Sequence, residues 1–92
     1  MNNLFKAIYK GKRVFLTGHT GFKGSWIAFW LRKLGAEVYG YSLKPLYEPS
    51  HYELLGLDVP ETIDDIRNYP GLASAIKKFS PDIVIHMAAQ PL

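Results

Sequence analysis

The sequence predicts an α/β protein with a doubly wound parallel sheet, of which these 92 residues supply the first half. Three observations lead to this fold class. A short apolar run at residues 13–17 ends directly in a glycine-rich turn, helical segments alternate with further apolar runs, and glycine or proline separates the segments. Strands that consist of continuous apolar runs are typical of a parallel sheet with both faces covered.

The first half of the chain contains a strand, a turn, a helix and a second strand. Residues 4–9 carry apolar side chains at helical spacing before the strand at 13–17. Residues 23–34 contain no proline, have two cations near their end and precede Gly35, which predicts a helix that ends there. Residues 38–41 then form a second strand, so this segment is one right-handed crossover unit.

The second half contains two shorter helices and two strands. Residues 50–55 begin with the serine and glutamate spacing of a capping box, which predicts a short helix. Residues 61–66 form a weak strand because three acids interrupt it. Residues 70–79 form a helix with proline in its first turn, and residues 83–87 form a strongly apolar fourth strand.

These strands would form a parallel sheet of order 3-2-1-4, as in the first half of a doubly wound fold. The chain stops six residues past His86, before a helix could cover the fourth strand. We therefore expect residues 1–92 to be the N-terminal part of a longer protein.

Composition excludes several other classes of protein. The hydrophobic share of 48% and charged share of 21% are those of a packed domain rather than a disordered chain. The absence of cysteine and the wide separation of the three histidines exclude a structural zinc site. No apolar run reaches the roughly 20 residues of a membrane span, so we expect a cytoplasmic protein without a membrane partner.

The positive net charge has two unequal parts. Residues 1–46 carry eight Lys or Arg against one acid, while residues 47–92 carry three against seven. The basic residues are spaced singly, without the blocks of charge that nucleic-acid binding requires. We interpret them as solvated surface and expect no nucleic-acid partner.

The glycine-rich turn carries the chemistry that this chain shows. Gly18, Gly21 and Gly24 follow the first strand in a G-x-x-G-x-x-G pattern at the start of a helix. The first glycine permits a sharp exit from the strand, the second lets backbone approach a pyrophosphate, and the third lets the helix pack close to the sheet. Together with the positive end of the helix, this pattern predicts the N-terminal part of a dinucleotide-binding Rossmann domain.

The phosphate-binding loop of nucleoside triphosphatases is the rival interpretation of this turn. That loop requires glycine, lysine and serine in this order at positions 23 to 25, whereas the sequence has Lys23, Gly24 and Ser25. Lysine in the wrong place cannot reach the β and γ phosphates, so triphosphate hydrolysis is disfavoured.

Longer strings of this sequence resemble the extended short-chain dehydrogenase/reductase family. They are Thr17–Trp26, Gly40–Leu43, Asp65–Arg67 and His86–Gln90. The resemblance runs through nearly the whole chain. It implies an NAD-dependent sugar-nucleotide dehydratase, a lyase that oxidises carbon 4 of a nucleotide sugar, eliminates water across carbons 5 and 6, and returns the hydride to carbon 6. The product would be a 4-keto-6-deoxy sugar for surface polysaccharide such as lipopolysaccharide O-antigen.

The resemblance also assigns residues to the cofactor site. Asp65 would accept from the adenine amine with Ile66 beside the ring, although the residues alone favour a solvated carboxylate at Asp65. Gln90 would begin the turn toward the active site. The family's catalytic Tyr-x-x-x-Lys pair does not occur, so we expect no catalytic residue in this chain. The assigned cofactor residues are Gly18, Thr20, Gly21, Phe22, Lys23, Gly24, Ser42, Asp65, Ile66, Ala88, Ala89 and Gln90.

The end of the second strand bears on the choice between NAD and NADP. NAD enzymes usually place an acid there, about 20 residues past the glycines. This sequence has Ser42 with Lys44 two residues later, and Glu37 lies at the far end of the strand. The residues alone permit NADP, while the resemblance favours NAD. We therefore hypothesise NAD with low discrimination against NADP.

Other functions stay open at this point. The chain could belong to another NAD(P)-dependent sugar-nucleotide epimerase or dehydratase, to a noncatalytic dinucleotide-binding sensor, or to a structural fragment without a ligand. A downstream Tyr-x-x-x-Lys would favour the enzyme over the sensor.

Three further features have structural interpretations. We expect His19 to form a structural hydrogen bond in the turn. We expect His86, in a strand buried on both faces, to be a core histidine or to face a neighbouring helix rather than to act as a base. The helix at 23–34 is apolar all round, with Trp26 and Trp30 among its residues. Its outer face then needs a cover from further chain or from a partner subunit, and we expect a homo-oligomer.

Overall fold

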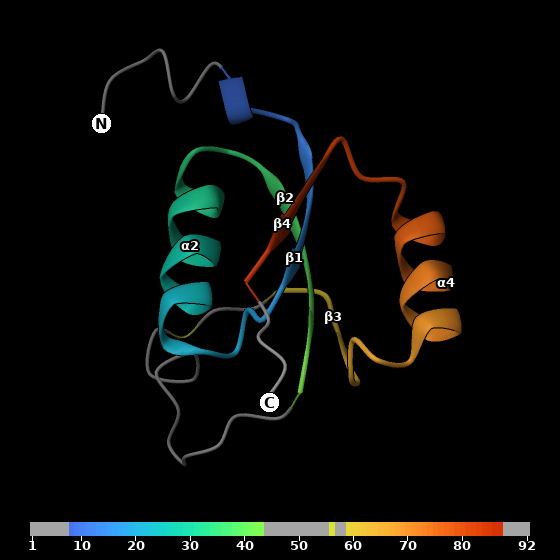
Figure 1. Ribbon diagram of the computed structural model, residues 1–92. Coiled ribbons are helices and arrows are strands. Elements are labelled where there is room, and N and C mark those ends of the chain that lie inside the picture. The colour runs from blue at the N-terminus through green and yellow to red at the C-terminus, as the bar shows by residue number, and fades with distance from the viewer. Residues whose placement is uncertain (1–7, 44–55, 57–58, 88–92) are drawn as a thin grey trace.

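The computed structural model describes residues 8–43, 56 and 59–87. Their elements follow in the order β1 (Arg13–Thr17), α2 (Phe22–Lys33), β2 (Glu37–Ser42), β3 (Glu61–Ile63), α4 (Tyr69–Phe79) and β4 (Ile83–His86) (Figure 1). All the strand pairs are parallel and the sheet order is β3-β2-β1-β4, which confirms the predicted order. The predicted helix at 50–55 lies outside the described residues, and of the one at 4–9 only Ile8 and Tyr9 are described, both helical.

The third strand is shorter than predicted. It ends at Ile63 rather than at residue 66, because local hydrogen bonds turn the chain. The carboxylate of Asp64 accepts from the amide of Asp65, and the carboxylate of Asp65 accepts from the amide of Arg67. Short acidic side chains that bind nearby backbone amides compete with strand pairing and favour turns.

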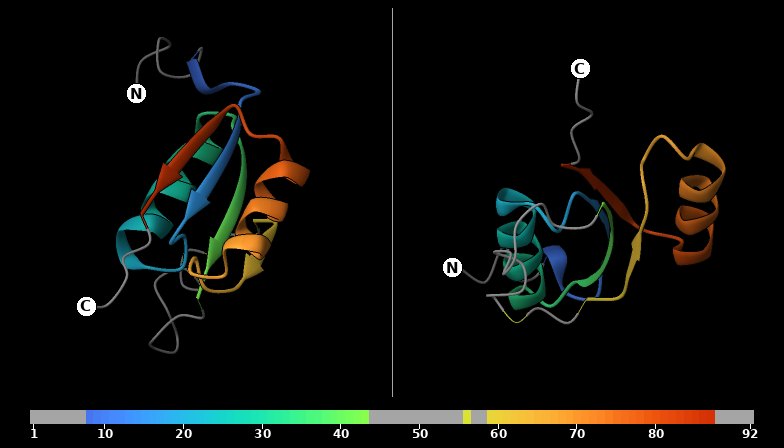
Figure 2. Two further views of the ribbon diagram at one scale, coloured as in Figure 1. Left: turned by 45° about the vertical axis from the view of Figure 1, so that its right-hand side comes forward. Right: turned by 90° about the horizontal axis from the view of Figure 1, so that it is seen from below.

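Helices α2 and α4 lie on opposite faces of the sheet (Figure 2). The strand β1 is buried on both faces, with Val14 and Leu16 in the core on the α2 side and Phe15 among aromatic rings on the α4 side. The core cluster on the α2 side comprises Val14, Leu16, Ala28, Leu31, Val38 and Val59. Among the described residues no helix has the length and apolar character to cross a membrane.

The parallel register places the carboxyl ends of the neighbouring strands β2, β1 and β4 side by side. Thr17, the last residue of β1, lies opposite Tyr41 of β2 and His86 of β4. The chain leaves β1 through Gly18 and enters α2 at Phe22, so the glycine-rich turn lies at the carboxyl edge of the sheet. In doubly wound folds this edge is where ligands bind.

Candidate functional site

The glycine-rich turn is tightly closed. Gly18 has a φ of +79°, and its amide donates to the carbonyl of Tyr41 at 2.9 Å. Its own carbonyl accepts from the amide of Gly21 at 3.2 Å. A Cβ on Gly24 would lie only 1.9 Å from the Gly18 oxygen. Only glycine therefore fits at position 24, which confirms the predicted close approach of the helix.

The start of α2 is open to an anion. The helix begins after Gly21, which has extended backbone and makes no side-chain capping bond, and the first turn contains no acidic residue. Phe22 and Lys23 at this start are exposed. The positive end of a helix dipole without a local acid favours a bound phosphate. The residues of the turn thus fit the pyrophosphate of a dinucleotide.

Thr20 connects the turn to the end of β2. Its hydroxyl donates to the carbonyl of Leu43 at 2.9 Å and lies 2.8 Å from the hydroxyl of Ser42. Since the single Thr20 proton goes to the carbonyl, the Ser42 hydroxyl donates to Thr20. Ser42 can then accept a hydrogen bond from a ribose hydroxyl.

His19 joins the turn to β3, through an interaction that sequence reasoning missed. Its ring is fully buried, and its Nε2 contacts the carboxylate of Glu61, the first residue of β3. The ring occupies the space above Gly40, where a Cβ would approach within 2.4 Å of it. The expected structural hydrogen bond of His19 is confirmed. Its partner could not be found from the sequence, because 42 residues separate the two.

Asp65 is held by Arg67. The guanidinium donates to both carboxylate oxygens at 2.5 to 3.0 Å, and the amide of Arg67 donates to Oδ1 at 2.8 Å. These bonds lower the pKa of Asp65 to about 2. The carboxylate is therefore ionised and acts only as an acceptor. The neighbouring Ile66 is half-buried.

His86 differs from its expected place. It is exposed, because β4 pairs in the described sheet only with β1 and its residues alternate between half-buried and exposed. The ring Nδ1 lies 2.8 Å from the hydroxyl of Thr17. The interpretation of His86 as a core histidine is thus wrong. The assigned residues Ala88, Ala89 and Gln90 lie outside the described residues.

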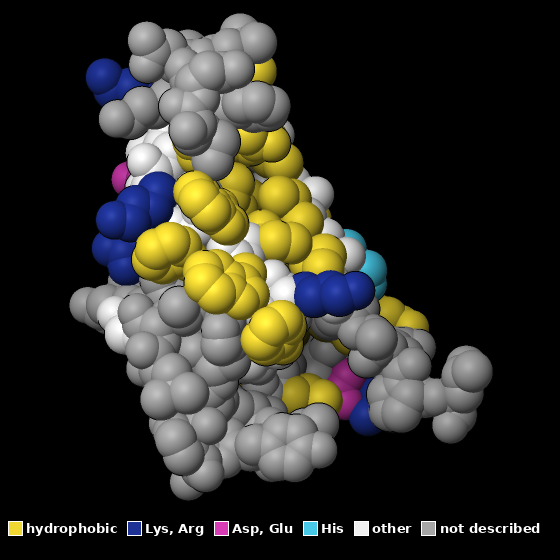
Figure 3. All heavy atoms as spheres, turned by 90° about the vertical axis from the view of Figure 1, so that its left-hand side faces the viewer, with side chains coloured by type: hydrophobic (Ala, Val, Ile, Leu, Met, Phe, Trp, Pro, Cys, Tyr) yellow, Lys and Arg dark blue, Asp and Glu magenta, His cyan; other side chains and the backbone are white. Residues whose placement is uncertain are grey.

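The outer face of α2 is apolar, as the sequence predicted (Figure 3). Trp26 is 38% exposed, Trp30 is 48% exposed, and Phe22 is 66% exposed. Phe29 lies between the two tryptophans, with ring centroids at 5.7 and 6.0 Å. A surface of this kind is typical of an interface with more protein.

The sheet order and the turn between β1 and α2 define a Rossmann-type fold. The chain belongs to the NAD dependent epimerase/dehydratase family, whose sequence pattern matches residues 14–92. This result confirms the family resemblance found in the sequence.

The chain is also similar to individual proteins of known sequence or structure. Over 89 residues the chain is 53% identical to CDP-glucose 4,6-dehydratase of Salmonella typhimurium, covering 95% of this chain and 25% of that protein. Among solved structures it is similar to the epimerase Mth375 of Methanothermobacter thermautotrophicus, with a TM-score of 0.73 and 30% identity. The similarity covers 96% of this chain and 25% of that one. It is also similar to UDP-glucose 4-epimerase of Brucella ovis in complex with NAD, with a TM-score of 0.73 and 26% identity. This similarity covers 89% of this chain and 24% of that one. The chain spans about a quarter of the length of each.

Proposed function

We propose that this chain is the NAD-binding part of a sugar-nucleotide 4,6-dehydratase that converts CDP-glucose to CDP-4-keto-6-deoxyglucose. The observation that carries the proposal is the closed turn from Gly18 to Gly24, where the approach of 1.9 Å leaves no room for a side chain on the third glycine. The identity of 53% to CDP-glucose 4,6-dehydratase supports the substrate and the reaction.

The residues of this chain would hold the cofactor at three places. Backbone amides of the turn would bind the pyrophosphate, with Gly21, Phe22 and Lys23 at the open helix start. Ser42 would accept from a ribose hydroxyl, held in orientation by Thr20. When bound, the nicotinamide supplies the hydride acceptor and donor for the sugar.

Asp65 would bind the adenine amine while it stays bonded to Arg67. Three N–H groups of Arg67 bond the two carboxylate oxygens, whose four lone pairs leave room for one further donor. Arg67 fixes the orientation of the carboxylate and keeps it ionised. Ala88, Ala89 and Gln90 complete the proposed cofactor site on the strength of the family resemblance.

The proposal includes NAD as cofactor, with low discrimination against NADP. Ser42 offers a ribose contact but no charge to repel a 2′-phosphate. Replacing Ser42 with Asp should lower NADP affinity and change NAD affinity little, because the added carboxylate acts mainly on the phosphate. Paired titrations of both cofactors on the full-length enzyme test this choice. Binding of NADP at least tenfold tighter than NAD to the native protein would show that the cofactor assignment is wrong.

The reaction is tested by incubating the full-length protein with NAD and CDP-glucose. A dehydratase yields a product lighter by one water, which mass spectrometry detects. The second candidate function is epimerisation, favoured by the similarity to structures of epimerases. An epimerase gives no change in mass but a new sugar isomer, which chromatography of CDP-glucose and UDP-glucose reactions separates. A noncatalytic sensor would bind NAD and convert neither.

The remaining features of the proposal concern the whole protein. We expect it to act in the cytoplasm, in the supply of deoxy sugars to surface polysaccharide, and to form a homo-oligomer. The exposed aromatic face of α2 supports further protein contacts at Trp26 and Trp30. Light scattering on the full-length protein measures the number of subunits.

A further inference from the structure

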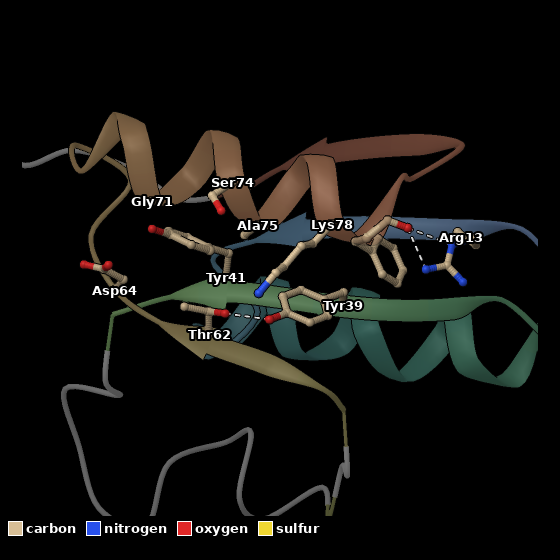
Figure 4. A pocket seen from close by; sticks show the side chains of 10 residues that line it. Arg13, Tyr39, Tyr41, Thr62, Asp64, Gly71, Ser74, Ala75 and Lys78 are labelled. Carbon is tan, nitrogen blue, oxygen red and sulfur yellow. Dashed lines mark hydrogen bonds between the residues drawn. The ribbon is translucent and has the colours of Figure 1, made fainter.

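A cavity of about 410 Å³ lies on the face of the sheet opposite to α2 (Figure 4). Helix α4 forms one wall, and β2 with β3 forms the other. The residues that matter for its chemistry are Tyr39, Tyr41, Asp64, Ser74, Ala75 and Lys78. A volume of this size is within the range of small-molecule sites.

The hydroxyl of Tyr41 is a buried polar group that lies beside the Asp64 carboxylate. The side chain is 0% exposed, and among the described residues its oxygen has no hydrogen bond. Figure 4 shows this hydroxyl directed along the cavity toward the Gly71 end of α4. Native proteins satisfy nearly all buried polar groups, and the oxygen of this hydroxyl can still accept a hydrogen bond from a molecule in the cavity.

Asp64 gives the same end of the cavity an acceptor. Its Oδ1 accepts from the amide of Asp65 and its Oδ2 from the side-chain amide of Asn68, which leaves each oxygen able to accept once more. Burial and the nearby Asp64 carboxylate raise the pKa of Tyr41, so its hydroxyl stays protonated. Ser74 adds a hydroxyl on the α4 wall.

Lys78 gives the cavity a cation away from Asp64. Its side chain extends from the last turn of α4 toward the sheet (Figure 4). Among the described residues its ammonium group makes no ion pair, whereas Arg13, at the end of the cavity far from Asp64, is bonded to Glu37 and to the carbonyl of Phe79 (Figure 4). The ring of Tyr39 lines the wall on the Arg13 side of the Lys78 ammonium group (Figure 4).

We propose that this cavity binds a small ring compound with an anionic group at Lys78 and a hydroxyl or amino donor at Tyr41 and Asp64. The ring lies along the wall that contains Tyr41 and Ala75. The described residues of the proposed dinucleotide site, which are those of the turn from Gly18 to Gly24 with Ser42, Asp65 and Ile66, do not line the cavity, so we treat it as a separate site. The anion is a carboxylate or a phosphate monoester, both of which an ammonium group binds.

Calorimetric titration of the full-length protein with three probes tests the proposal. Para-hydroxybenzoate carries both groups, benzoate lacks the donor, and phenol lacks the anion. We expect para-hydroxybenzoate to bind about tenfold more tightly than either of the others, since a charge-assisted bond is lost in each comparison. Para-hydroxyphenyl phosphate keeps the hydroxyl donor, so its affinity relative to that of para-hydroxybenzoate identifies the preferred anion. Failure of all these probes to bind would overturn the proposal.

Matched variants locate the bound probe. Lys78→Gln should weaken para-hydroxybenzoate about tenfold, and Lys77→Gln, at the neighbouring exposed position outside the cavity, should change it less than twofold. Tyr41→Phe should weaken it severalfold. Ala75→Phe fills the cavity and should abolish binding. Equal loss in both lysine variants would contradict the proposed site.

Competition with NAD separates this site from the proposed function. Saturating NAD should leave the affinity for para-hydroxybenzoate unchanged. Displacement of the probe by NAD would place it in the dinucleotide site and overturn the proposal. Conversely, a protein that binds the probe but no NAD would refute the proposed function alone.

Discussion

The two faces of the sheet are covered by helices of similar length that pack in different ways. Helix α2 buries Gly24, Ser25, Ala28 and Leu31, whereas α4 buries no residue and leaves a cavity beneath it. The tight face belongs to the helix that begins at the glycine-rich turn. Close packing is thus concentrated beside the glycine-rich turn, where we propose that a dinucleotide binds.

Helix α4 is held mainly at its two ends. At its start the side chain of Asn68 accepts from the amide of Gly71. At its end the ring of Phe79 contacts Phe15 and Tyr39, and Arg13 donates twice to the Phe79 carbonyl. Contacts at both ends without a buried middle leave space between helix and sheet.

The largest effect is expected at Gly24. Its replacement with alanine should destabilise the full-length protein by about 3 kcal/mol or more, because the methyl group would overlap the Gly18 carbonyl, which is backbone and cannot move aside. Urea unfolding measures the loss. Gly21→Ala is the control, since its Cβ would lie an ordinary 3.5 Å from the same oxygen. Equal stability of the two variants would contradict the tight closure of the turn.

A pair of alanines compares the two faces directly. Ala28 is fully buried under α2, while Ala75 lines the cavity under α4. Ala28→Leu should cost about 1–3 kcal/mol by overpacking, and Ala75→Leu should be neutral or stabilising because it fills space. Thermal unfolding of both variants gives the difference. A larger loss at Ala75 than at Ala28 would show that the α4 face is the tighter one.

The smallest effect concerns Asp65 at the entrance to α4. Its folded pKa of about 2 lies below the ordinary 3.8, so its bonds to Arg67 stabilise the fold above about pH 4. That contribution fades as the pH falls from about 4 to about 2. Arg67→Gln should return the pKa toward 3.8, which a carbon NMR titration of the carboxyl group detects. An unchanged pKa in Arg67→Gln would mean that Arg67 is not the cause.

The α2 side of the sheet could be predicted from the sequence, whereas the α4 side could be predicted only in part. The apolar run at β1, the glycine pattern and the cations before Gly35 are local signals, and they correctly gave β1, α2 and the sheet order. The early end of β3 was missed, since side-chain bonds of Asp64 and Asp65 outweigh the strand pattern.

Long-range features could not be derived from spacing. The contact of His19 with Glu61 joins segments far apart in the chain, and the exposure of His86 depends on the place of β4 in the sheet. The burial of the Tyr41 hydroxyl beside Asp64 depends on where α4 lies above the sheet. Such features follow from tertiary packing, which no single segment encodes.

Titration of NAD into the full-length protein and its Gly21→Val variant tests the central claim that the turn binds a dinucleotide. Gly21 is exposed, so valine there should leave the fold intact, but its branched side chain would stand where backbone must meet the pyrophosphate. Ala73→Val, at an exposed position of α4, is the control. We predict at least about a hundredfold loss of NAD affinity in Gly21→Val and none in the control. Unchanged affinity in a folded Gly21→Val protein would contradict the assignment of the site.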